Sequence, residues 1–359
     1  MLKNHRLNII ISVGLLILIG LLMIYSSSYV WAEYKFNNKY HYLIYQLFFL
    51  IFSIFVSKII INMDVSFIKK NINWFLLIGI ILLILVLIPG VGVVRNGSRS
   101  WFSLGPMGFQ PSELIKIILI IFTSKYLEKY HSRINNLREN LVPLLLILCI
   151  VILLIMLEPD FGSSMIIILS ILLMLFSSGL KYKFFSYMGI FGIFGISIII
   201  IIAPYRLTRI ISFINPWKDP LGSGYQIIQS LYAIGPGGLF GQGLFSSVQK
   251  NFYLPEPQTD FIFSILCEEL GIITAMFIIL LFLFLFYNIY IISVKEKDLF
   301  KKFLVFGIGG SLIIQTVMNL SVVVGLVPVT GVTLPFFSYG GSSLLTSLIE
   351  ISIILNIAK

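Results

Sequence analysis

Long apolar runs separated by shorter polar segments extend along the whole chain. A helix needs about 20 consecutive apolar residues to cross a bilayer, so runs of this length predict transmembrane helices. The sequence contains ten of them, at residues 7–30, 41–61, 72–89, 111–127, 141–157, 161–180, 184–204, 260–292, 303–325 and 338–357. It lacks the alternating pattern of a membrane β-barrel. We therefore expect an all-α polytopic membrane protein of about ten transmembrane helices, with residues 1–359 forming a single integral membrane domain.

Composition and charge refine this picture. Hydrophobic residues make up 58% of the chain and charged residues 11%, with a mean hydropathy of +1.02, which excludes an ordinary soluble globular protein. Cys149 and Cys267 lie inside apolar runs without metal-ligand spacing, so both are expected to be small buried hydrophobic residues.

The distribution of Lys and Arg predicts the orientation. With the N-terminus inside, the inner loops and span ends carry sixteen Lys and Arg, the outer loops carry eight, and Lys116 lies within a span. Since cytoplasmic loops carry the excess of positive charge, both termini are expected in the cytoplasm. The net charge of +10 is then mainly membrane-orienting, and no nucleic-acid surface is expected. Segments 90–110 and 205–259 fall outside, the second as a large extracytoplasmic loop between spans seven and eight.

Four carboxylates gather within fourteen residues of this mostly apolar chain, namely Glu256, Asp260, Glu268 and Glu269. Acids at membrane depth are costly and mark functional sites. The alternative is that Asp260 only caps a helix while the two deeper acids form its wet end. Helical spacing would place Glu268 about 80° around from Asp260 and Glu269 nearly opposite, so only Glu268 is expected to share a cavity with Asp260.

The approach to Asp260 contains two prolines, Pro255 and Pro257. Each fixes its own φ and favours extended structure before it, which predicts a stiff extended segment over 252–258. Thr259 or Asp260 could cap the helix that follows. A helix over 260–292 would be about 50 Å long against a hydrocarbon core of about 30 Å, so its outer turns are expected to project or the helix to tilt.

Several outer residues are candidates for binding an anion or supporting the site. In loop 90–110, Arg95, Arg99 and Trp101 indicate a binding surface. Glu113 and Lys116 are three residues apart on one helix face, in reach of each other, either as a structural pair or in contact with phosphate. The glycine-rich stretch GPGGLFGQG could cradle an anionic headgroup together with the outer cations. The basic candidates for a lipid-linked pyrophosphate are Arg99, Lys116, Arg206, Arg209 and Lys250.

Two further turns carry polar residues on the outer side. In EPDFGSS, Glu158 and Asp160 could bind a cation or cap the following span, and the cap is favoured. Near the C-terminus, LPFFSYGGSS brings Ser342 to the start of the last span, within irregular backbone that must be buried in protein or line water.

Five motifs together resemble the SEDS family of bacterial membrane proteins: RSWFSLGPMGFQPSELIKI, EPDFGSS, NPWKDPLGSGYQIIQSLYAIGPGGLFGQGL, YLPEPQTDFIF followed by EELG, and LPFFSYGGSS. They occur in order over most of the chain. Pro216-Trp217, QSLYAIGPGG and SVQKNFYLPEP are more similar to the FtsW and SpoVE branch of division and sporulation than to the RodA branch of elongation. The stretch GLFSSVQK departs from the FtsW pattern, in which a glycine is expected near Phe245.

This resemblance implies a peptidoglycan glycosyltransferase that polymerises lipid II at the outer face of the bacterial cytoplasmic membrane. It also implies a class B penicillin-binding transpeptidase as partner, within the division or elongation machinery, and an essential acid at Asp260. A sugar hydroxyl that attacks an anomeric carbon needs a general base, and a departing polyprenyl pyrophosphate needs basic side chains or a divalent cation such as Mg²⁺ or Mn²⁺. No cofactor is certain. The competing hypotheses are a RodA-like elongation polymerase, a lipid II flippase or transporter, and a scaffold.

Overall fold

A computed structural model describes residues 2–95, 97–104, 107–134, 140–190, 192 and 213–359. Its first half contains α1 (Leu2–Phe36), α2 (His41–Asn62), α3 (Val65–Leu87), β1 (Gly92–Arg95), β2 (Ser98–Leu104), β3 (Met107–Phe109), α4 (Pro111–Tyr130), η1 (His131–Arg133), α6 (Val142–Leu157) and α7 (Phe161–Ser177). The second half contains η2 (Pro216–Lys218), α10 (Tyr225–Gly237), α11 (Ile262–Lys295), α12 (Leu299–Val323) and α13 (Gly341–Ile357).

Named helices lie in nine of the ten predicted apolar ranges, and residues 182–190, at the start of the tenth, are also helical. The remaining range, 184–204, falls mostly outside the described residues, so the number of spans and the place of the large loop stay predictions. By length and composition, α1, α2, α3, α11 and α12 could each cross a membrane, while α6, α7 and α13 are shorter apolar helices. The expected helical membrane fold is therefore confirmed.

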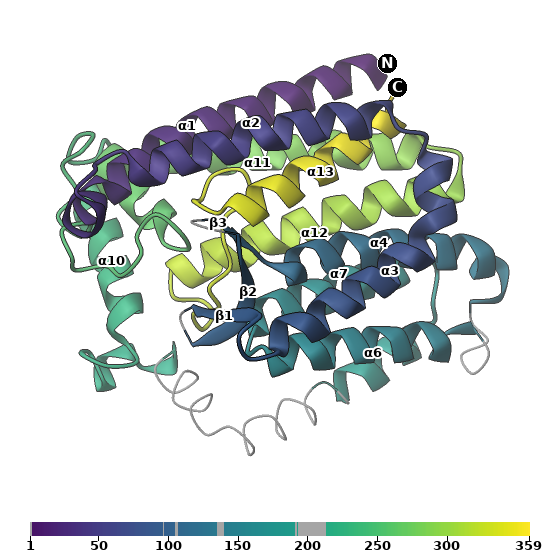
Figure 1. The fold of residues 1–359 in the computed structure, drawn as a ribbon. Helices are drawn as coiled ribbons and strands as arrows, with labels where there is room; N and C mark the ends of the chain where they lie inside the picture. The colour runs from purple at the N-terminus through teal and green to yellow at the C-terminus, as the bar shows by residue number, and fades with distance from the viewer. Residues whose placement is uncertain (1, 96, 105–106, 135–139, 191, 193–212) are drawn as a thin grey trace.

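Helix α12 is the centre of the bundle (Figure 1). It packs against α4, α7, α11 and α13. In its most apolar 18-residue stretch 67% of the residues are buried, compared with 11% in that of α2 at the periphery. Small residues allow the close approach: a Cβ on Gly307 would lie 2.6 Å from Met174 Sδ and 2.8 Å from Ile120 Cγ2.

A small antiparallel sheet of order β1-β2-β3 packs against α3, α4 and α13. The sequence analysis places segment 90–110 in an outer loop and predicts no strands there, so the sheet is an addition to the expected all-α fold. Strands of 4, 7 and 3 residues are too short to give a clear alternating pattern.

Helix α11 is broken near its N-terminal end. Gly271 has φ 76° and ψ 177°, which separates residues 262–270 from the rest of the helix. Backbone carbonyls of Gly238 and Leu239 accept the N–H groups of Ile272 and Ile273 at 3.0 and 3.2 Å, so the break leaves these donors satisfied. The predicted excess length of this helix is thus accommodated by a break at a glycine.

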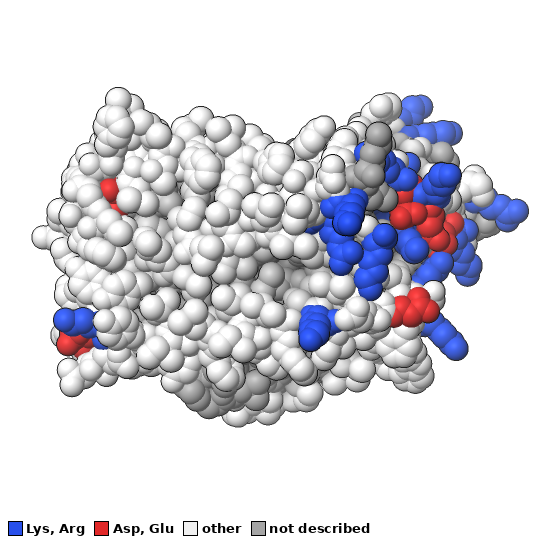
Figure 2. All heavy atoms as spheres, turned by 90° about the horizontal axis from the view of Figure 1, so that it is seen from above, with Lys and Arg blue, Asp and Glu red and all other residues white. Residues whose placement is uncertain are grey.

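Charge is distributed unevenly along the bundle. Figure 2 shows Lys and Arg side chains gathered at one end of the molecule, the end where Figure 1 places both termini. The orientation of this end in the membrane stays a prediction.

Candidate active site

Asp260 lies in the turn that leads into α11, at the end of the bundle away from the termini. The N-cap of α11 is Phe261, which makes no side-chain capping bond, so the idea that Thr259 or Asp260 caps this helix is wrong. Instead, Thr259 Oγ1 donates to Asp260 Oδ1 at 2.8 Å. Asn319 Nδ2 of α12 donates to the backbone carbonyl of Asp260, also at 2.8 Å. The half-buried carboxylate is therefore positioned without being used as a helix cap.

The environment of Asp260 suits a base that works near neutral pH. Burial raises the pKa of Asp260 to about 6; the hydrogen bond from Thr259 opposes this rise and the nearby Glu256 adds to it. A general base is most effective when its pKa lies close to the working pH, and an ordinary exposed aspartate lies well below it.

Segment 252–258 is a chain of turns and bends, which contradicts the expected extended approach. Phe252 and Glu256 have φ values of 70° and 46°, outside extended backbone. Thr259 N donates to Glu256 O at 3.1 Å, closing a turn around Pro257. The prolines restrict the segment, but turn hydrogen bonds fold it back. Tyr339 N then donates to Gln258 O at 2.9 Å, joining the segment to the α12–α13 connection.

Tyr339 is surrounded by groups from three other parts of the chain. Its ring lies 5.0 Å from that of Tyr42 on α2. Burial raises the pKa of Tyr339 to about 12, Tyr42 and Tyr45 add to the rise, and Arg95 of β1 opposes it. These groups form one wall beside the segment that carries Asp260.

The sheet determines which arginine belongs to this wall. Arg95 stacks on Trp101 with its guanidinium carbon 5.2 Å from the ring, and its side chain covers Gly108. Arg99 Nη1 instead donates to Leu87 O at the C-terminal end of α3, at 3.4 Å. The structure thus keeps Trp101 at the predicted surface but favours Arg95 over Arg99. The signal missed in the sequence is the Asn-Gly pair of RNGSR, which is typical of a two-residue hairpin turn.

Glu113 and Lys116 form the predicted ion pair on α4, with 2.9 Å between Oε2 and Nζ. Lys116 is buried and also donates to Gln315 Oε1 of α12 at 2.8 Å, while Thr346 Oγ1 of α13 donates to Glu113 Oε2 at 3.2 Å. Structural pairing, one of the two readings left open by the sequence, is therefore confirmed.

Asp160 caps α7 as predicted, accepting from Ser163 N at 3.0 Å. It also accepts from Gln110 Nε2 and Ser112 Oγ at 2.9 and 3.0 Å. The buried Ser342 accepts from Gln110 N and donates to Gly108 O, both at 3.1 Å, and so supports the junction of β3, α4 and α13.

The described residues contain no group of three or more His, Cys, Asp or Glu side chains that could hold a metal ion. Glu158 is fully buried, and burial, with the nearby Asp160 adding to the effect, raises its pKa to about 9.

Lys250 is not available to a pyrophosphate in this structure, which corrects its expected role. Only 1% of its side chain is exposed, and Nζ lies 2.6 Å from Oε1 of the equally buried Glu269. Sequence spacing does not predict this pair, because Lys250 and Glu269 are brought together only when the loop before Asp260 folds onto α11.

Glu268 also differs from its expected role beside Asp260. It accepts from Ser247 Oγ at 2.5 Å and from Val248 N at 2.8 Å, and it is 1% exposed. Glu256 is exposed and near Asp260, as its electrostatic effect shows. Arg206 and Arg209 lie outside the described residues.

The C-terminal end of α10 packs directly on the N-terminal part of α11, at Cys267 and Glu268. A Cβ on Gly237 would lie 2.0 Å from the carbonyl oxygen of Cys267, closer than any real contact. We expect Gly237→Ala to lower the melting temperature of the detergent-solubilised protein, because backbone must move. Gly235→Ala in the same helix is the control, since a Cβ there meets nothing within 4 Å. Equal melting temperatures for the two variants would contradict this packing.

Phe245 has a φ of 68°, a left-handed conformation that favours glycine. This explains in physical terms why a glycine was expected near this position. The Phe245 ring meets Tyr25 edge-on at 5.8 Å, a contact that contributes to holding the strained residue.

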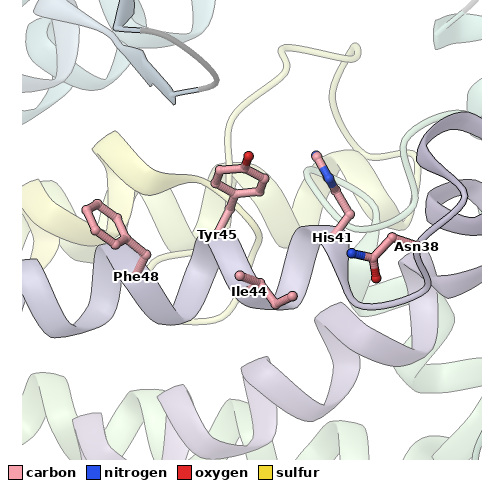
Figure 3. A pocket seen from close by; sticks show the side chains of 5 residues that line it. All are labelled: Asn38, His41, Ile44, Tyr45 and Phe48. Atoms are coloured by element: carbon pink, nitrogen blue, oxygen red, sulfur yellow. The ribbon is translucent and has the colours of Figure 1, made fainter.

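A hollow of about 350 Å³ lies at the start of α2, lined by Asn38, His41, Ile44, Tyr45 and Phe48 (Figure 3). Its lining contains no carboxylate or lysine, and its ionisable side chains are His41 and Tyr45, whose rings lie 4.7 Å apart. Tyr45 connects it to the wall around Tyr339.

Comparisons with known proteins identify the family. The profile of the FtsW/RodA/SpoVE family, described as cell cycle proteins, matches residues 6–359. The chain belongs to this family. It is 46% identical to stage V sporulation protein E of Bacillus subtilis, over 96% of this chain and 94% of that protein. It is 39% identical to a probable peptidoglycan glycosyltransferase FtsW of Coxiella burnetii, over 96% and 93% of the two chains.

Solved structures show the same fold for this FtsW/RodA/SpoVE member. A chain from a peptidoglycan synthase complex that coordinates polymerisation and crosslinking superposes with a TM-score of 0.79 at 28% identity, covering 98% of this chain and 96% of that one. The rod shape determining protein RodA of Thermus thermophilus gives a TM-score of 0.71 at 25% identity, over 98% and 95%.

Proposed function

We propose that this protein is a peptidoglycan glycosyltransferase that polymerises lipid II into glycan strands, in septum synthesis during division or sporulation. The observation that carries the proposal is Asp260, a half-buried carboxylate with a pKa of about 6 that lies just before α11 and does not cap this helix. Relatives of this chain are named for the same activity. The similarity to the sporulation protein supports the division and sporulation branch over elongation.

In the proposed reaction, the acceptor sugar's hydroxyl attacks the donor's anomeric carbon with inversion. Asp260 accepts the hydroxyl proton as the new glycosidic bond forms, and the bond from the anomeric carbon to the pyrophosphate breaks. The developing negative charge on the leaving group needs a cation. Among the described cations we favour Arg95, which is exposed beside Tyr339, the residue bonded to the segment that carries Asp260; Lys250 and Lys116 are buried in ion pairs.

The proposed setting is the bacterial cytoplasmic membrane, with both termini in the cytoplasm and Asp260 at the outer face. The Lys and Arg gathered at the end with the termini support this orientation. A class B penicillin-binding transpeptidase is the proposed partner, supported by the fold shared with a chain of a synthase complex.

The test is polymerisation of purified lipid II by the purified chain in vesicles, alone and with a class B transpeptidase. Glycan strands of several disaccharides are expected with at least one of the two preparations. A chain that moves lipid II across the bilayer without lengthening it would instead support a transporter.

The same assay is expected to depend on pH in one direction. Because the pKa of Asp260 is raised to about 6, the base is protonated and inactive below that value and ionised above it. The polymerisation rate should therefore rise about tenfold per pH unit below pH 6 and level off above it. A rate that stays constant from pH 5 to 8 would contradict a base with this pKa.

A further inference from the structure

Lys250 and Glu269 join the two ends of the segment that contains Asp260. Lys250 precedes Asp260 by ten residues and Glu269 follows it by nine. Their side chains meet at 2.6 Å with 1% and 0% of their surface exposed. The ion pair thus closes residues 250–269 into a loop around the proposed base.

The pair is anchored to α1. Ser26 Oγ donates to the second oxygen of Glu269 at 2.5 Å, and Lys250 Nζ lies 4.8 Å from the centre of the Tyr29 ring. A buried ion pair whose remaining atoms are also bonded has one preferred geometry, because any departure leaves a charge unsatisfied in an apolar interior.

Glu268 holds the chain just before Lys250. It accepts the hydroxyl of Ser247 at 2.5 Å and the N–H of Val248 at 2.8 Å. Backbone bonds add to this, since Gln242 N and Gly243 N donate to the carbonyls of Glu268 and Glu269 at 2.9 and 3.0 Å. The outer end of α11 and the loop before Asp260 are therefore tied together at several points.

Asp260 depends on these ties for its position. Its carboxylate is bonded to Thr259, which moves with it, and the outer part of α11 is separated from the membrane-spanning part by the break at Gly271. A rigid continuous helix therefore does not fix the carboxylate relative to the bundle. Its position is instead set by Asn319, which binds the Asp260 carbonyl, by Tyr339, whose N–H binds the Gln258 carbonyl, and by the tied ends of the segment.

We infer that Lys250 and Glu269 are positioning residues for Asp260: their ion pair, fixed on Ser26, holds the proposed base in place without touching substrate. The inference rests on the proposed role of Asp260 as base. It gives the EELG motif and the lysine before the YLPEP stretch a function that is separate from anion binding.

The test is the double substitution Lys250→Met with Glu269→Gln. Either single change leaves a lone buried charge and is expected to destabilise the protein, whereas the double change removes both charges and should restore the melting temperature. We expect the double variant to polymerise lipid II with a kcat about 10- to 100-fold lower and a nearly unchanged KM, because small misplacements of a catalytic group cost this much. Hydrogen exchange of residues 251–260 should become faster.

Glu269→Asp is a second test variant, and it remains informative even if the double variant fails to fold. It keeps both charges and withdraws the carboxylate by one methylene, so kcat should fall several-fold while the protein remains folded. The control is Lys69→Met with Glu128→Gln, a 2.7 Å pair joining α3 and α4 at the other end of the bundle, expected to leave kcat unchanged.

Parental kcat in both the double variant and Glu269→Asp would overturn the inference and leave the pair a purely structural contact. A parental chain that fails to polymerise lipid II, alone and with a transpeptidase, would overturn the proposed function and this inference with it. Loss of kcat with parental exchange protection over 251–260 would also overturn the inference, since it would place Lys250 or Glu269 in the chemistry itself.

Discussion

Asp260→Asn is expected to reduce lipid II polymerisation about a hundredfold or more while the protein still inserts, binds lipid II and recruits its transpeptidase. The amide keeps the shape of the side chain but cannot accept the proton from the attacking hydroxyl, and a lost general base costs about 10²–10⁴ in rate. The hydrogen bond from Thr259 can still be made to the amide oxygen, and the bond from Asn319 goes to the backbone, so the local fold is preserved. The measurement is the rate of glycan synthesis by purified parent and variant at saturating lipid II.

Asp298→Asn is the matched control. Asp298 is a true N-cap, accepting from Lys301 N at 3.0 Å at the start of α12, and asparagine caps equally well. The same chemical change at that cap should therefore leave both stability and activity near parental values. If Asp260→Asn also polymerises at the parental rate, Asp260 has only a structural role and the proposed mechanism is wrong.

The helices were predictable because the apolar runs are long enough to be recognised without any knowledge of packing. Local pairing was predictable for the same reason: Glu113 and Lys116 are fixed at three-residue spacing on one helix, and Asp160 stands directly before the helix it caps. In each case the partners are neighbours in sequence, so helical geometry alone determines the contact.

The pairing of Lys250 could not be predicted in this way. Seen along the chain, it is an outer lysine among aromatic and polar residues, with nothing to distinguish it from a phosphate ligand. Its partner Glu269 is placed by the break at Gly271 and by the close packing of the α10 loop on the outer part of α11. Both are tertiary effects that the sequence does not show. The angles predicted for Glu268 and Glu269 relative to Asp260 also assumed that Asp260 is part of the helix, whereas α11 begins at Ile262.

The arginines of loop 90–110 show the same limit. The sheet pairs Arg95 with Ser98 and Val94 with Arg99, with an irregularity between Val93 and Val94. One arginine is thereby directed to Trp101 and the other to the end of α3. The strands are too short to show a regular alternation of apolar and polar residues, so the sequence does not show which arginine faces Trp101.

Because the charges around Lys116 are buried, the stability lost on substitution depends on which charged side chain is removed. Lys116 is bonded to Glu113 and Gln315, and Glu350 of α13 lies near enough to interact with it electrostatically. Both carboxylate oxygens of Glu350 are buried and have no hydrogen-bond partner within the described part of the chain. Lys116 therefore compensates two carboxylates at once.

Lys116→Met is accordingly expected to be the most damaging single change in this cluster, costing about 3–5 kcal/mol or more, the scale for breaking a buried ion pair. Glu113→Gln should cost less, because the ammonium keeps Glu350 as a counter-charge. The double variant, Glu113→Gln with Lys116→Met, should lose less than the sum of the single changes, since it removes one of the stranded charges. Unfolding of the detergent-solubilised variants by SDS titration measures these losses.

Adding Glu350→Gln distinguishes this account from a simple pair. If Lys116 serves both carboxylates, the triple variant Glu113→Gln, Lys116→Met, Glu350→Gln should be more stable than the double variant, because its last uncompensated carboxylate is gone. Glu350→Gln alone should be tolerated, since Lys116 keeps its bonds to Glu113 and Gln315. Additive losses for Glu113 and Lys116, or a triple variant no more stable than the double, would show that these side chains do not share their charges.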